Sequence, residues 1–86
     1  MDRAPSPKLV VPDLGMPGAV ITLSLWLVPE GAEVLEGDRV AEVLCGAVTI
    51  DLEAPVTGRL VRHLVDEDAA VAPGTAIAAF EASAEQ

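Results

Sequence analysis

The stretch Leu-Val-Pro-Glu-Gly-Ala-Glu-Val at residues 27–34 returns, in altered form, as Leu-Val-Asp-Glu-Asp-Ala-Ala-Val at residues 64–71. The two stretches are 37 positions apart and align without a gap, and the same register carries Val43 onto Phe80. Self-similarity at a fixed offset indicates repeated structural units. We therefore expect two equivalent halves related by a pseudo-two-fold axis; the alternative is a chance match in a chain rich in Ala and Val.

The segments around these stretches predict an all-β domain. Apolar residues make up 51% of the chain but aromatic residues only 2%, so the core must be built largely from aliphatic side chains that favour strands. Gly, Pro and acidic turns separate the apolar runs, and no run keeps the period of a helix. The expected strands are 9–12, 20–28, 39–45, 48–53, 58–65 and 76–81, with short bridging segments at Val34 and Val71.

The link between the halves, residues 43–48, predicts the two ends of the molecule. Shifted by 37 positions, it falls near residues 9–10 and 83–84, so the link and the chain ends should occupy opposite poles. Gly46-Ala47 has the Gly-X form of a type II′ hairpin turn, which predicts an exposed tip. We expect a flexible tail at 1–7, one domain at 8–82 and a fringe at 83–86.

Length and charge exclude several classes of function. A chain of 86 residues is one domain, and five basic against fourteen acidic residues give a net charge of −9. This balance excludes nucleic acid and anionic membranes as partners and favours a protein with a basic docking face. No apolar run reaches the ~18 residues of a membrane span, and the first residues lack a secretory signal. With a single cysteine, a cytoplasmic location is expected.

Three further motifs resemble a known family. They are Val-Pro-Asp-Leu-Gly at 11–15, Trp-Leu-Val-Pro-Glu-Gly at 26–31 and Glu-Ala-Pro-Val-Thr-Gly at 53–58. Together they are similar to the lipoyl/biotinyl carrier domains, and most to the lipoyl domains of dihydrolipoamide acyltransferases in 2-oxo acid dehydrogenase complexes. The resemblance implies a flattened sandwich of two four-stranded sheets, and a domain that shuttles acyl groups between active sites.

The chain departs from this family at the attachment hairpin. Family members carry Glu-Thr-Asp-Lys-Ala there, with the lipoyl or biotinyl group joined to the lysine. Counting back from Ala54 without a gap places Ala47 at the acceptor position, inside the degenerate segment Cys45, Gly46, Ala47 and Val48. The chain's single lysine is Lys8, which we expect at the opposite pole. A methyl group cannot form the amide, so neither lipoate nor biotin is expected.

Other candidate residues predict no catalytic or metal site. Cys45 lies beside the tip, but Glu42 and Asp51 would oppose a thiolate, so we favour a semi-buried strand residue. His63 has no second ligand at metal spacing and is expected to be a surface imidazole. The acidic run 66–68 lacks a calcium-loop pattern and is expected to be a solvated turn. We therefore do not expect an enzyme.

Three functions remain open. The first is a lipoyl-like domain that has lost its carrier role and serves as a docking, scaffold or regulatory module for a protein such as a 2-oxo acid dehydrogenase component. The second is a carrier relative that works through Cys45. The third is a structural lipoyl-like module of a transport assembly, although such modules usually carry a long helical insertion between the halves.

Overall fold

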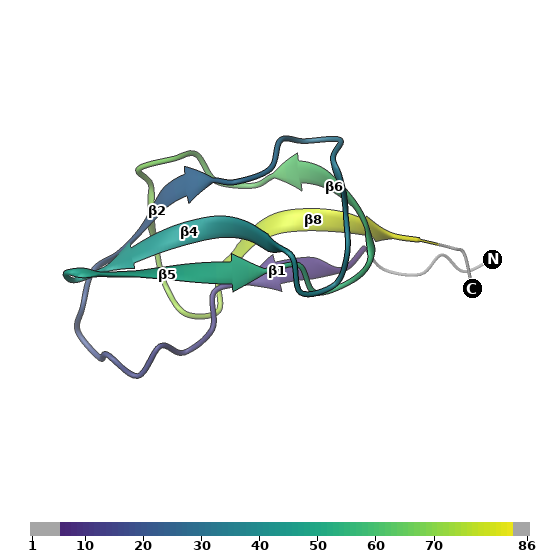
Figure 1. Cartoon of the computed structure of the whole chain (residues 1–86). Helices are drawn as coiled ribbons and strands as arrows, with labels where there is room; N and C mark the ends of the chain where they lie inside the picture. Colours follow the sequence, from purple (N-terminus) through teal and green to yellow (C-terminus); the bar gives the residue numbers. More distant parts are fainter. Residues whose placement is uncertain (1–5, 84–86) are drawn as a thin grey trace.

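The computed structural model describes residues 6–83, which form two four-stranded antiparallel sheets facing each other (Figure 1). The first sheet has the strand order β1-β8-β6-β3 and the second has the order β5-β4-β2-β7. The expected all-β sandwich is confirmed. The predicted tail and terminal fringe lie largely outside the described residues. The strands are β1 Lys8–Val10, β2 Ile21–Trp26, β3 Glu33–Val34, β4 Arg39–Cys45, β5 Val48–Glu53, β6 Gly58–His63, β7 Ala70–Val71 and β8 Ala76–Ala82.

The two sheets are copies of each other at the level of strand register. Ile21 of β2 pairs with Cys45 of β4, and 37 positions later Gly58 of β6 pairs with Ala82 of β8. Both pairings contain a bulge at the same place, centred on Ser24 in β2 and on the corresponding residue of β6. The order of strands in one sheet therefore maps onto the order in the other, which confirms the pseudo-two-fold relation expected from the repeat.

The hydrophobic core fills the space between the sheets. Strand residues alternate between buried and exposed positions, so each sheet presents one apolar face inward. Leu23 and Leu60, which are equivalent under the repeat, are both fully buried, as are Val43 and Phe80. Each such side chain contributes roughly 1.5–3 kcal/mol of burial free energy. Among residues 6–83 no polar or charged residue is buried, so the charged groups lie on the outer faces and turns.

Two turns that are equivalent under the repeat form the same hydrogen bond to the other half of the molecule. The Gly31 amide donates to the Leu60 carbonyl at 2.7 Å, and the Asp68 amide donates to the Leu23 carbonyl at 2.7 Å. Both residues have positive φ, 92° for Gly31 and 76° for Asp68. Aspartate is among the few residues other than glycine that tolerate this conformation. The repeat therefore preserves the backbone conformation of the turn while changing its side chain.

The fold separates two poles. The β4–β5 hairpin forms one end of the molecule, and the last described residues lie at the other end (Figure 1). At that far pole the Ser83 amide donates to the Thr57 carbonyl at 2.8 Å. The predicted placement of the link and the chain ends is confirmed for the described part. No helix of residues 6–83 is long and apolar enough to cross a membrane.

Candidate functional site

The tip of the β4–β5 hairpin is a two-residue turn. Cys45 and Val48 form its last strand pair, which leaves Gly46 and Ala47 as the two turn residues. Gly46 has a φ of 62°, while Ala47 is not among the described residues with positive φ. Positive φ at the first turn position only is the signature of a type II′ turn, whose twist matches that of the flanking strands. The Gly-X prediction is therefore confirmed, and the positive φ favours glycine at this position.

Ala47 lies exposed at this tip. Its position is the one from which a long side chain would project away from the domain. Its own side chain is a methyl group, which holds no nucleophile and no hydrogen-bonding atom. Lys8, the chain's single lysine, lies exposed in β1 of the other sheet, where it pairs with Ala79. The tip thus presents an exposed methyl group at its turn, while the lysine lies on the other sheet.

The loop between β1 and β2 supports the hairpin from one side. The Gly46 amide donates to the Val20 carbonyl at 3.4 Å, and the Cys45 thiol donates to the Met16 thioether at 3.4 Å. Beside this contact the loop borders a hollow of about 240 Å³, lined mostly by apolar residues that include Leu14, Met16 and Ile21. The β1–β2 loop therefore contacts the hairpin at its base.

Cys45 is fully buried, with 0% of its surface exposed. It is thus more deeply buried than the semi-buried position expected from its sequence. Thiol chemistry needs a thiolate that solvent and reactants can reach. A carrier role for Cys45 would require this core residue to leave its contact with Met16, so the arrangement opposes it.

His63 is not a free surface imidazole, which corrects the sequence-based expectation. Its ring is half-buried and stacks on Trp26 with 3.9 Å between ring centroids and 10° between planes. Trp26 and His63 are equivalent under the repeat, so the stack lies where the two halves meet. The Trp26 ring N–H donates to the Val65 carbonyl at 3.1 Å, and His63 Nε2 lies 3.0 Å from the Val28 carbonyl. A carbonyl can only accept, so Nε2 carries the proton.

Glu67 of the acidic run 66–68, and its equivalent Glu30, accept hydrogen bonds from the backbone of the two stacked residues. The Trp26 backbone amide donates to the Glu67 carboxylate at 2.9 Å, and the His63 backbone amide donates to the Glu30 carboxylate at 2.8 Å. The run itself is exposed, as expected for a solvated turn. Among residues 6–83, no three His, Cys, Asp or Glu side chains gather as a metal-binding group. Sequence reasoning missed this role of Glu30 and Glu67, although the 37-residue offset aligns the two residues.

This fold and this tip define a class of protein: two symmetric antiparallel sheets that present a tight hairpin opposite the first and last described residues, as carrier domains do. The family model described as "Biotin-requiring enzyme" matches residues 9–80. The chain belongs to this lipoyl/biotinyl carrier domain family.

A curated relative narrows the comparison. The chain is 36% identical over 70 residues to the dihydrolipoyllysine-residue acetyltransferase component of the acetoin cleaving system of Bacillus subtilis (strain 168). The aligned segment covers 81% of this chain and 18% of the relative. The aligned part of this chain therefore spans less than a fifth of the length of that acetyltransferase component.

Proposed function

We propose that this chain is a lipoyl-type domain that docks onto the dehydrogenase component of a 2-oxo acid dehydrogenase or related acyl-transfer complex without carrying an acyl group. The observation that carries the proposal is Ala47 at the exposed turn position where the family's attachment lysine is expected. The domain would then act as a scaffold or a competitor, and would not itself be an enzyme.

The proposal that no lipoate or biotin is attached rests on elementary chemistry. Attachment forms an amide between a carboxyl group and a side-chain amine, and arginine does not serve as such a nucleophile. Lys8 is the single lysine, and it extends from a three-residue strand whose hydrogen-bonded neighbour is β8. It therefore lacks the tight hairpin that presents a lysine to a ligase.

The choice of partner rests on the relative and on charge. This chain is similar to part of an acetyltransferase component, so the component it would visit is a different one, and we propose the dehydrogenase. A net charge of −9 favours a partner with a basic docking face, which would speed encounter and select orientation. The single cysteine, free and buried, agrees with the cytoplasmic location that this proposal includes.

The two other functions are less well supported. An acyl carrier that works through Cys45 needs a reachable thiol, whereas Cys45 is fully buried. A structural module of a transport assembly would usually carry a helical insertion at the hairpin, whereas β4 and β5 are joined here by Gly46 and Ala47 alone.

Two measurements test the proposal. The purified protein is incubated with a lipoate ligase and, separately, with a biotin ligase, with an authentic lipoyl domain as the positive control, and its intact mass is measured. We expect no added mass. Stoichiometric addition of lipoate or biotin would contradict the proposal.

Docking is tested by competition. A purified 2-oxo acid dehydrogenase component acylates a lipoylated domain, and this protein is added at increasing concentration. We expect inhibition that is overcome by excess lipoylated domain, since both would occupy one surface. Unchanged kinetics at saturating concentrations would show that the chain does not dock on this component.

A further inference from the structure

The pseudo-two-fold relation allows the outer faces of the two sheets to be compared position by position. In the first sheet Glu33, Arg59 and Glu81 lie side by side across β3, β6 and β8. The same row in the second sheet is formed by Ala70, Thr22 and Leu44, which pair across β7, β2 and β4. Since the backbone pairing is identical, any difference between these rows reflects side-chain choice and not the fold.

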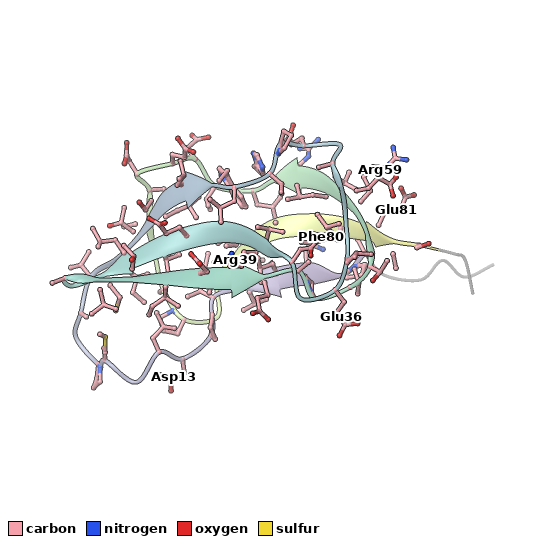
Figure 2. All side chains as sticks on the ribbon, in the orientation of Figure 1. Asp13, Glu36, Arg39, Arg59, Phe80 and Glu81 are labelled. Atoms are coloured by element: carbon pink, nitrogen blue, oxygen red, sulfur yellow. The ribbon has the colours of Figure 1, made fainter. Side chains whose placement is uncertain are left out.

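The row of the first sheet is charged throughout. Arg59 lies between two carboxylates, and its guanidinium is 3.6 Å from Glu33. Arg59 and Glu81 project outward together at the end of the molecule opposite the β4–β5 hairpin (Figure 2). The next outward row contains Arg62 and Lys8, so this face mixes both signs of charge. Such a surface is expected where a sheet faces only water.

The row of the second sheet carries no charge, and it runs into the hairpin tip. Thr49 of β5 extends the row beside Leu44, and Val20 and Ala47 adjoin it at the turn. We call these five residues the uncharged tip face: Val20, Thr22, Leu44, Ala47 and Thr49. Val20 is 70% exposed and Leu44 39%.

Two long segments that contribute to the hairpin end of the molecule carry no charged residue. Residues 14–29 and 43–50 contain none, although the whole chain carries 19 Asp, Glu, Lys and Arg residues. Exposed apolar side chains gathered on one face mark an interaction surface. Glu81, at the position equivalent to Leu44, shows that this backbone accepts a carboxylate there, so the fold does not demand the uncharged row.

Acidic groups border the uncharged tip face. Glu42 and Asp51 pair across β4 and β5 in the next outward row. Arg39 forms an exposed ion pair with Asp51 at 3.2 Å, and Glu42 accepts a hydrogen bond from the Ser24 hydroxyl at 3.3 Å. The border therefore has an excess of negative charge, and a matching surface would carry basic side chains around an uncharged centre.

We infer that the uncharged tip face is the surface by which this domain docks, and that its occupant is an apolar patch bordered by basic side chains on the dehydrogenase component. This inference rests on the proposed function and adds to it the docking surface and the chemistry of its counterpart. The tip then contributes binding through Leu44 and Val20, where a carrier domain would contribute an acyl arm.

The molecule supplies its own matched control for the test. Leu44→Glu gives the second sheet the residue that the first sheet carries, and Glu81→Leu makes the reciprocal change at the equivalent position. Both sites are exposed and lie in the equivalent strands β4 and β8, so neither substitution changes a core residue. Binding of each variant to the purified 2-oxo acid dehydrogenase component is measured by titration calorimetry, with circular dichroism as the check of folding.

We expect Leu44→Glu to weaken binding by at least about tenfold, because an unpaired carboxylate would be buried in an uncharged contact, and Glu81→Leu to change it by less than about twofold. Equal effects of the two variants, or a loss in Glu81→Leu alone, would overturn the inference while the proposed function stands. A wild-type protein that does not bind overturns both. If Leu44→Glu does not fold, Thr22→Arg and its reciprocal Arg59→Thr decide the question on the same criteria.

Discussion

The two poles of this domain share a backbone plan but differ in what they leave exposed. At the terminal pole Gly58 pairs with Ala82, and the strand ends approach to 2.8 Å between the Ser83 amide and the Thr57 carbonyl. At the tip pole Ile21 pairs with Cys45, and the equivalent hydrogen bond is 3.4 Å long. One pole is packed tightly beside a charged face, and the other ends in an uncharged hairpin.

This difference distinguishes the features that folding requires from the exposed residues that are free to serve a function. The register, the bulges and the turn hydrogen bonds are the same in both halves, because each half must bury the same kind of apolar face. The residues at the exposed positions differ, because folding places little demand on them. A feature present in one half only is therefore the place to look for function, and the uncharged tip face is such a feature.

The largest expected effect is a loss of stability from a substitution at the terminal pole. A Cβ on Gly58 would lie 2.1 Å from the Glu81 carbonyl oxygen, which is closer than any real contact allows, and the obstructing atoms are backbone. We expect Gly58→Ala to lower the free energy of unfolding by about 3 kcal/mol or more. Denaturant unfolding measures it.

The matched control for this variant is Gly46→Ala at the tip pole. A Cβ there meets nothing within 4 Å, so only the positive φ of 62° opposes it. We expect a loss of about 1–2 kcal/mol, the ordinary cost of a left-handed residue. Equal losses for the two variants would contradict the assignment of Gly58 as a close-approach position.

An intermediate effect is expected at the centre, where the halves are most alike. His63→Ala removes the stack on Trp26 and the donor to the Val28 carbonyl, which together contribute about 2 kcal/mol. The exposed neighbour Arg62→Ala should change the free energy of unfolding by less than about 0.5 kcal/mol. If His63→Ala is as stable as Arg62→Ala, the stack does not help to hold the halves together.

The smallest effect sharpens the comparison of the two turns. Asp68 has a φ of 76° where its equivalent, Gly31, has 92°. Asp68→Gly relieves the strain of this conformation, although glycine also has greater entropy in the unfolded chain. We expect a net gain of about 0.5 kcal/mol in the free energy of unfolding. Thermal unfolding of this variant beside the wild type measures the gain, and a clear loss would mean that the Asp68 side chain stabilises the turn.

Most of the fold could be predicted from the sequence because the repeat and the alternation of apolar residues report directly on strand pairing. Strands 39–45 and 48–53 were predicted with their observed ends, since Gly46-Ala47 marks the turn between them. Strand β2 ends at Trp26, two residues earlier than predicted, because the chain then turns toward Pro29.

The stack of Trp26 on His63 could not be predicted, because the repeat aligns two unlike rings and nothing local shows that an axis passes between them. The uncharged tip face was missed for a related reason. Thr22 lies far from Leu44 and Thr49 in the chain, and only strand order brings it into one row with them. The assignment of the acceptor position to Ala47, by contrast, comes from a gapless count along the sequence and stays a prediction, while the exposed two-residue turn that contains Ala47 is confirmed.

The most direct test of the central claim, that the attachment scaffold is intact and only its chemistry is missing, is the intact mass of Ala47→Lys after incubation with a lipoate ligase. This variant keeps Gly46 and its positive φ, so the type II′ turn is preserved. We predict that Ala47→Lys gains one lipoyl group while the wild type gains none. Lipoylation of the wild type, at Lys8 or elsewhere, would contradict the claim, and so would an Ala47→Lys variant that stays unmodified.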